Sequence, residues 1–62
     1  MKDFVAWKVV KSDRGWAICG MYARGAWVQV MKGFRDADFA TNMMCAMNKH
    51  GAVMYDLNGC AI

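Results

Sequence analysis

The chain has 62 residues, of which 58% are hydrophobic, and a formal net charge of +3 at pH 7. A chain of this length predicts a single small domain over residues 1–62 that buries only about 60% of the surface its unfolded form exposes, so we expect some apolar side chains to stay outside. No uncharged apolar run reaches the roughly 18 residues of a membrane-spanning helix, and the start MKDFVAWKVVK is too charged for a signal peptide, which predicts a cytoplasmic protein without a membrane partner.

The first half of the chain predicts a three-stranded antiparallel meander. Residues 4–10 are rich in β-branched and aromatic side chains, the turn sequence KSDRG follows, and residues 16–22 have the composition of a second strand. The short turn ARG then leads to a third strand at residues 26–31. Gly15 and Gly25 supply the backbone freedom that the two hairpins need.

A helix is expected next, from about Asp36 to His50. Asp36 is a candidate N-cap, the following residues are rich in Ala, Met and Asn, and Gly51 is a candidate C′ residue. The helix face that we expect to be buried carries four apolar residues, Phe39, Met43, Ala46 and Met47, with His50 beyond them.

Residues 52–57 predict a last strand, which completes the order β-β-β-α-β. The predicted fold class is therefore α+β, with the helix packed on one face of the sheet. The sequence leaves open whether the last strand lies beside the first or beside the third.

Alternation along the strands sorts the side chains into two faces. The face expected beneath the helix is the more uniformly apolar one and holds Val5, Trp7, Val9, Ile18, Val28, Val30, Tyr55 and Leu57. The opposite face holds Ala6, Lys8, Ala17, Cys19, Met21, Trp27, Gln29 and Met31. A single helix leaves this second face uncovered, and it is unusually apolar for contact with water. By the same alternation we expect Trp16 in the core and Trp27 on the opposite face.

The uncovered face predicts a protein-binding surface, because aromatic residues and Met are enriched at such surfaces. The candidate partner-binding residues are Lys8, Met21, Trp27, Gln29 and Met31. The expected partner is another protein or a second copy of this chain, as suits a small inhibitor or adaptor of a larger complex.

Single-stranded nucleic acid is the alternative partner. The stretch RGWAICGM resembles the RNA-recognition signature, and AWVQV is similar to the aromatic strands of cold-shock domains. Ile18 stands where that signature has its second aromatic residue, and a helix from Asp36 does not belong in a cold-shock barrel. The sequence is therefore assigned to neither family.

The charge distribution supports this alternative more than the motif does. Residues 1–35 carry seven basic and two acidic side chains, net +5, whereas residues 36–62 carry one basic and three acidic side chains, net −2. Meander geometry predicts a basic end made by Lys11, Arg14, Lys32 and Arg35, with Arg24 at the far end. These four residues are the candidate nucleic-acid or anion-binding site, although a solvated rim that keeps strand edges from pairing explains the same charges.

Catalytic and metal-binding patterns are sparse. The chain has no Glu, one His and no Gly-rich phosphate loop, so we expect no enzyme, no small-molecule substrate and no cofactor. Cys45 and His50 project about 140° apart on a helix, while a Cys–His pair that uses Cys19 or Cys60 stays open. Three Cys and one His match a zinc-ligand count but lack C-x₂-C spacing, so we expect no metal, and the odd Cys number is typical of reduced thiols.

Overall fold

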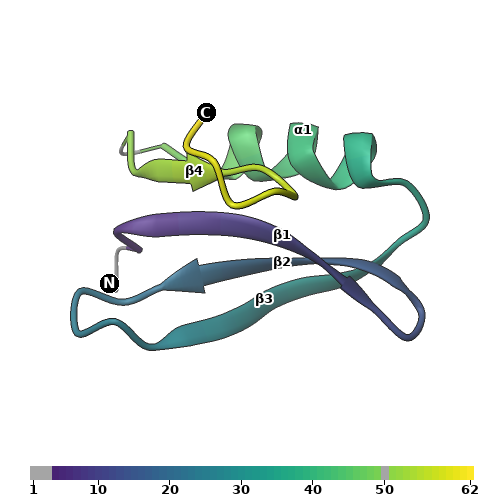
Figure 1. Ribbon diagram of the computed structural model, residues 1–62, viewed down its shortest axis with the longest axis horizontal. Helices are drawn as coiled ribbons and strands as arrows, with labels where there is room; N and C mark the ends of the chain where they lie inside the picture. Colours follow the sequence, from purple (N-terminus) through teal and green to yellow (C-terminus); the bar gives the residue numbers. More distant parts are fainter. Residues whose placement is uncertain (1–3, 50) are drawn as a thin grey trace.

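A four-stranded sheet and one helix make up the computed structural model, which describes residues 4–49 and 51–62. The elements are β1 Ala6–Ser12, β2 Gly15–Met21, β3 Trp27–Phe34, α1 Ala37–Met47 and β4 Val53–Tyr55 (Figure 1). This order confirms the predicted β-β-β-α-β arrangement. In the described ranges no helix has both the length and the apolar character to cross a bilayer.

The strands lie in the order β3-β2-β1-β4, so the last strand is beside the first. β1 pairs antiparallel with β2, β2 pairs antiparallel with β3, and β4 pairs parallel to β1 with Ala6 opposite Val53. A parallel neighbour needs a long crossover, and α1 supplies it by carrying the chain back along the sheet. The sheet is therefore mixed, where the meander alone is antiparallel.

The core lies between the sheet and α1. Trp7, Val9 and Ile18 of the sheet pack against Ala40 and Met44 of the helix, and all five are buried. Trp16 is half-buried and packs against this cluster, as its alternation with Ile18 predicts.

The buried face of α1 differs from the predicted one. Ala40 and Met44 are fully buried, whereas Phe39 is 57% exposed and Ala46 is also exposed. Met43 and Met47 flank the core, so half of the predicted face is correct. The helix is rotated by about one residue from the expected orientation, which places the small side chain of Ala40 where the helix lies against the sheet.

The ends of α1 are set by two polar side chains. Asp36 has extended backbone angles and its carboxylate accepts a hydrogen bond from the Asp38 N–H at 3.1 Å, which confirms the predicted N-cap. The predicted end near His50, with Gly51 as C′, is wrong: the last helical residue is Met47 and Asn48 is the C-cap; His50 itself lies outside the described residues.

Asn48 ends the helix early because its side chain bonds the chain that follows. Its Nδ2 donates to the Ala52 carbonyl at 2.7 Å, and its Oδ1 accepts from the Ala52 N–H at 2.9 Å. This pair of bonds closes a tight connection and directs the backbone into β4.

Substituting Asp36 with alanine removes the N-cap bond, and the free energy of unfolding should fall by about 1 kcal/mol. Asp36→Asn keeps an acceptor at the same position and serves as the control. Urea denaturation of both variants measures the difference. Equal stability of the alanine variant and the native protein would show that the cap contributes nothing.

Three residues predicted for the core face lie elsewhere. Val5 is 42% exposed and Leu57 is 51% exposed, because they lie outside β1 and β4, where strand alternation no longer sets direction. Met54, not Tyr55, packs against the core. The register explains this: Met54 is opposite Trp7, while Tyr55 is opposite Lys8 on the other face.

Candidate functional site

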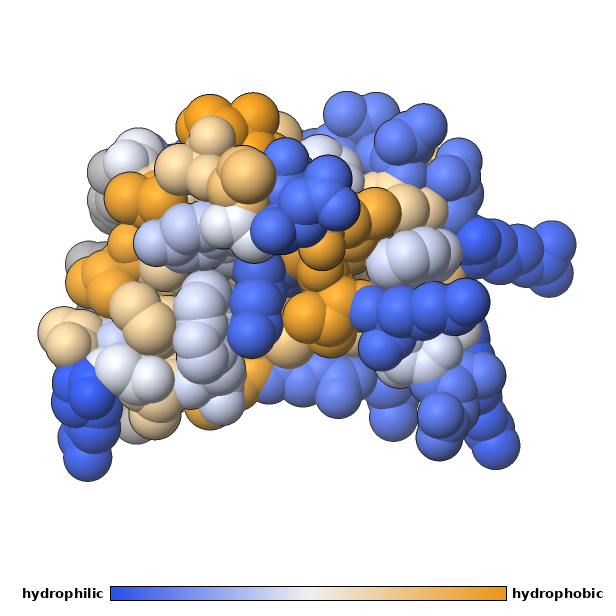
Figure 2. All heavy atoms as spheres, viewed as in Figure 1, coloured by the Kyte–Doolittle hydropathy of each residue, from blue (hydrophilic) through white to orange (hydrophobic). Residues whose placement is uncertain are grey.

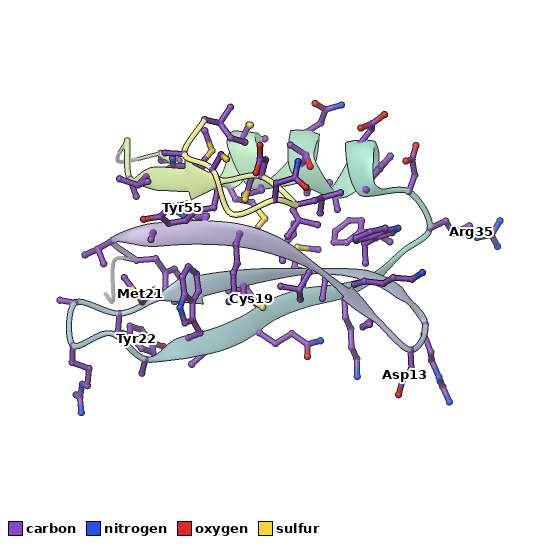
Figure 3. The ribbon with its side chains drawn as sticks, viewed as in Figure 1. Asp13, Cys19, Met21, Tyr22, Arg35 and Tyr55 are labelled. Atoms are coloured by element: carbon purple, nitrogen blue, oxygen red, sulfur yellow. The ribbon has the colours of Figure 1, made fainter. Side chains whose placement is uncertain are left out.

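The sheet face turned away from α1 carries two rows of residues that cross all four strands. The pairing places Val53, Ala6, Met21 and Trp27 in one row, and Tyr55, Lys8, Cys19 and Gln29 in the next. Residues paired across strands point to the same side of a sheet, and both rows alternate with the core residues. We call these eight residues the open face; Figure 3 labels Met21, Cys19 and Tyr55 on it.

Trp27 is the largest exposed side chain of the open face, at 36% exposure. The Lys8 ammonium lies over its ring, with Nζ 4.2 Å from the ring centroid. A contact of this kind is worth about 0.5–1 kcal/mol at an exposed site. It holds the indole in place and leaves one ring face covered by a cation.

The open face is apolar but not bare. Ala6 is almost fully buried although it alternates with the core residue Trp7. In the row of Val53, Ala6, Met21 and Trp27, the other exposed apolar side chain is Val53, which lies on β4 at the opposite edge of the sheet. A partner that binds the open face would contact Trp27 and Val53 at its two edges and the aliphatic part of Lys8 between them.

Met31 is 40% exposed, as expected for a partner-binding residue, but its pairing sets it apart from the two rows of the open face. Gln29 is opposite Cys19, but Met31 is opposite the core residue Ile18, so an extra residue interrupts the alternation of β3. A second shift follows near Gly33, which has φ +88. Such bulges realign the side chains that follow them. The pairing before the bulge brings together the other four predicted partner-binding residues, Lys8, Met21, Trp27 and Gln29.

The predicted basic end is present, where the β1–β2 turn and the β3–α1 connection meet. Figure 2 shows hydrophilic residues gathered at this end, and Figure 3 places Asp13 and Arg35 there. The β2–β3 turn that contains Arg24 is at the other end of the molecule (Figure 1).

Three of the four basic residues divide between the two faces of the sheet, and Arg35 follows the end of β3. Lys11 is opposite Trp16, which packs against the core, so Lys11 lies on the helix side. Arg14 and Lys32 instead line a cleft of about 520 Å³ together with Gln29, Ser12, Asp13 and Gly33. The sequence missed Asp13 and Ser12 as members of this cleft; their place in the KSDRG turn was the available signal.

Val53 and Tyr55 are the open-face residues that sequence reasoning missed. Strand alternation assigned Tyr55 to the core, and nothing in the sequence places β4 next to β1. An apolar hollow at Phe34, Phe39 and Arg35 was also missed, in which the two rings are 5.8 Å apart.

All three cysteines are free thiols. Cys19 is half-buried on the open face, whereas Cys45 and Cys60 are exposed elsewhere. Within residues 4–49 and 51–62 no three His, Cys or acidic side chains form a group that would hold a metal ion.

Comparison with known proteins gives no relative: no family model, no curated protein and no solved structure matches this chain.

Proposed function

We propose that this protein is a non-enzymatic binding module that engages another protein through the open face. The observation that carries the proposal is the exposed indole of Trp27, which contacts Lys8 on a sheet face that no second layer covers within residues 4–49 and 51–62. Aromatic rings held in a fixed position are typical anchors of protein interfaces, since little side-chain entropy is lost when they bind. A role as a small adaptor or inhibitor of a larger complex fits such a surface.

Charge favours an acidic partner surface over a second copy of the chain. The open face carries Lys8, the adjoining cleft adds Arg14 and Lys32, and Asp13 is the one acidic residue lining that cleft. A two-fold dimer through this face would bring the same basic groups together, whereas acidic groups on a different protein would neutralise them. We place this activity in the cytoplasm, where three free thiols persist.

Single-stranded nucleic acid is the second candidate, favoured by the cleft that joins Arg14 and Lys32. Bases bind such proteins by stacking on aromatic rings. Here the Lys8 ammonium already covers one face of the Trp27 ring, and Asp13 adds negative charge to the cleft. Both features weigh against a phosphate backbone with stacked bases.

The native thiols allow a direct test. A variant with Cys45→Ser and Cys60→Ser keeps only Cys19, on the open face, while a variant with Cys19→Ser and Cys60→Ser keeps only Cys45, on the helix. Each is labelled with a benzophenone maleimide and irradiated in an extract of the source cells. We expect the Cys19 probe to cross-link to a protein and the Cys45 probe to give no such product.

Adding Trp27→Ala to the Cys19 variant should reduce the yield of the product by about thirtyfold, as expected for loss of a binding hot spot worth about 2 kcal/mol. A nuclease-sensitive product would instead favour the nucleic-acid candidate. A product of twice the chain mass would identify a second copy as the partner, and equal yields with and without Trp27 would refute the anchor.

A further inference from the structure

The two edges of the sheet are not equivalent. On the β4 side the chain folds back on its own last strand: Ala61 bridges Tyr55, and the Ile62 N–H donates to the Met54 carbonyl at 2.8 Å. The Asp56 N–H also donates to the Cys60 carbonyl at 2.9 Å, which closes the turn between them. This edge is covered by the protein's own backbone.

The other edge, formed by β3, has no such cover. β3 is the terminal strand of the sheet, and in the described part of the chain no strand pairs with its outer side. Five of its eight residues are exposed. Sheet edges left open in this way present rows of unpaired N–H and C=O groups, which another extended chain can pair with.

Hydrogen bonding in the β2–β3 hairpin shows which backbone groups of β3 point away from β2. The Tyr22 N–H donates to the Ala26 carbonyl at 2.9 Å, so this pair is hydrogen-bonded. Hydrogen-bonded and non-hydrogen-bonded pairs alternate along an antiparallel ladder, and Trp27 and Gln29 are therefore in non-bonded pairs with Met21 and Cys19. Their N–H and C=O groups point away from β2, toward the free edge.

We propose that an extended acidic segment of a partner protein adds to the sheet as a fifth strand beside β3, pairing with the backbone of Trp27 and Gln29 and placing carboxylates at Lys32 and Arg14. This inference rests on the proposed function and specifies the chemistry of the partner. Gln29 belongs both to the open face and to the cleft that Arg14 and Lys32 line, so one strand beside β3 reaches both.

Charge complementarity selects this occupant over a second β3. Residues 27–35 contain Lys32 and Arg35 and no acidic residue, so a second copy brings no carboxylate to the cleft. Among the described residues no ion pair neutralises Arg14 or Lys32. An acidic segment can satisfy both sets of groups, since its backbone can pair with β3 and its carboxylates can pair with Arg14 and Lys32.

The probe is a fluorescein-labelled peptide of eight residues that alternates Val and Glu, which places all its carboxylates on one face of an extended strand. A peptide that alternates Val and Lys is the charge control. We expect fluorescence anisotropy to detect binding of the Glu peptide by the full chain at low salt and at least tenfold weaker binding of the Lys peptide.

Two matched pairs of variants separate backbone pairing from charge. Gln29→Pro removes an outward N–H, a change that edge strands tolerate, whereas Gln29→Ala keeps it; the proline variant should bind the Glu peptide about three- to tenfold more weakly than the alanine variant, as for loss of one hydrogen bond. Lys32→Glu should weaken binding by a similar factor, and Arg24→Glu, an equal charge change in the far turn, should have little effect.

Hydrogen exchange in the native protein gives a readout that does not depend on any variant folding. The amide protons of Trp27 and Gln29 should exchange more slowly when the Glu peptide is added, because they become hydrogen-bonded. Unchanged exchange at both amides, or equal binding by the Gln29→Pro and Gln29→Ala variants, overturns strand addition.

The outcomes also distinguish this inference from the proposed function. If Trp27→Ala weakens cross-linking to the cellular partner while the β3 variants change nothing, the open face binds the partner by another mode. No binding of the Glu peptide up to about 1 mM, which would mean a binding free energy weaker than about −4 kcal/mol, overturns the acidic segment as occupant. Concentration-dependent dimerisation that is abolished by Gln29→Pro would identify a second copy instead.

Discussion

Replacing Trp7 with alanine is expected to remove a large part of the free energy of unfolding and to lower the melting temperature steeply. Trp7 is 6% exposed, belongs to the core cluster, and meets the Phe4 ring edge-on with centroids 4.9 Å apart. Removing a buried Trp side chain costs about 3–5 kcal/mol. A domain of 62 residues has a total stability of roughly 3–9 kcal/mol at typical values per residue, so this one loss is between about a third and the whole of it.

The other two tryptophans provide a graded comparison. Trp16 is half-buried against the core and should cost less than Trp7, while Trp27 is exposed on the open face and should cost least, on the order of 1 kcal/mol, including its contact with Lys8. Thermal and urea denaturation followed by far-ultraviolet circular dichroism measure the series. If Trp27→Ala were as destabilising as Trp7→Ala, the open face would have to be part of the core.

The second large effect is expected at Gly15, in the first of the two Arg-Gly turns. Gly15 has φ +118, and a Cβ added there would overlap the carbonyl oxygen of Phe34 and lie 3.2 Å from its carbonyl carbon. Both atoms belong to the backbone of the neighbouring strand, which has little freedom to move. Gly15→Ala should therefore combine backbone strain with overpacking and cost roughly 2–6 kcal/mol.

Gly25, in the second Arg-Gly turn, is the matched control. It has φ +94, yet a Cβ there would meet no atom within 4 Å. Gly25→Ala should thus cost only the strain, about 1–3 kcal/mol, and urea denaturation of the two variants gives the difference due to close approach. Equal losses would show that the contact with Phe34 is relieved at no cost. The two turns read alike in sequence but differ in what lies beside them.

Local signals were enough to predict the order of the elements. The turn sequence KSDRG, the β-branched run before it and the Asp36 cap each depend on neighbouring residues, and each corresponds to an observed element or cap. The separation of Trp16 from Trp27 was also predictable, because the extra residues lie in β3 after Gln29 and leave the alternation within β2 intact.

The errors arose where distant parts of the chain determine the result. Met31 lies outside the two rows of the open face because of a shift in the pairing of β3 with β2, which alternation within β3 cannot reveal. Gly33 was the one local indication of an irregularity in β3, since an isolated Gly in a strand often marks a bulge. Ala40 was overlooked in favour of Phe39 because hydrophobicity alone ranks the larger residue higher, whereas close helix–sheet packing favours the smaller one.

The parallel pairing of β4 with β1 also bears on the sequence of folding events. Ser12 and Gly15, paired in the first hairpin, are three residues apart, whereas Ala6 and Val53 are 47 apart. The entropy lost on closing a loop grows with its length, and pairings distant in sequence slow folding. The meander should therefore form first, and docking of α1 and β4 should be the slow step that buries Trp7, so that its fluorescence reports the end of folding and not the beginning.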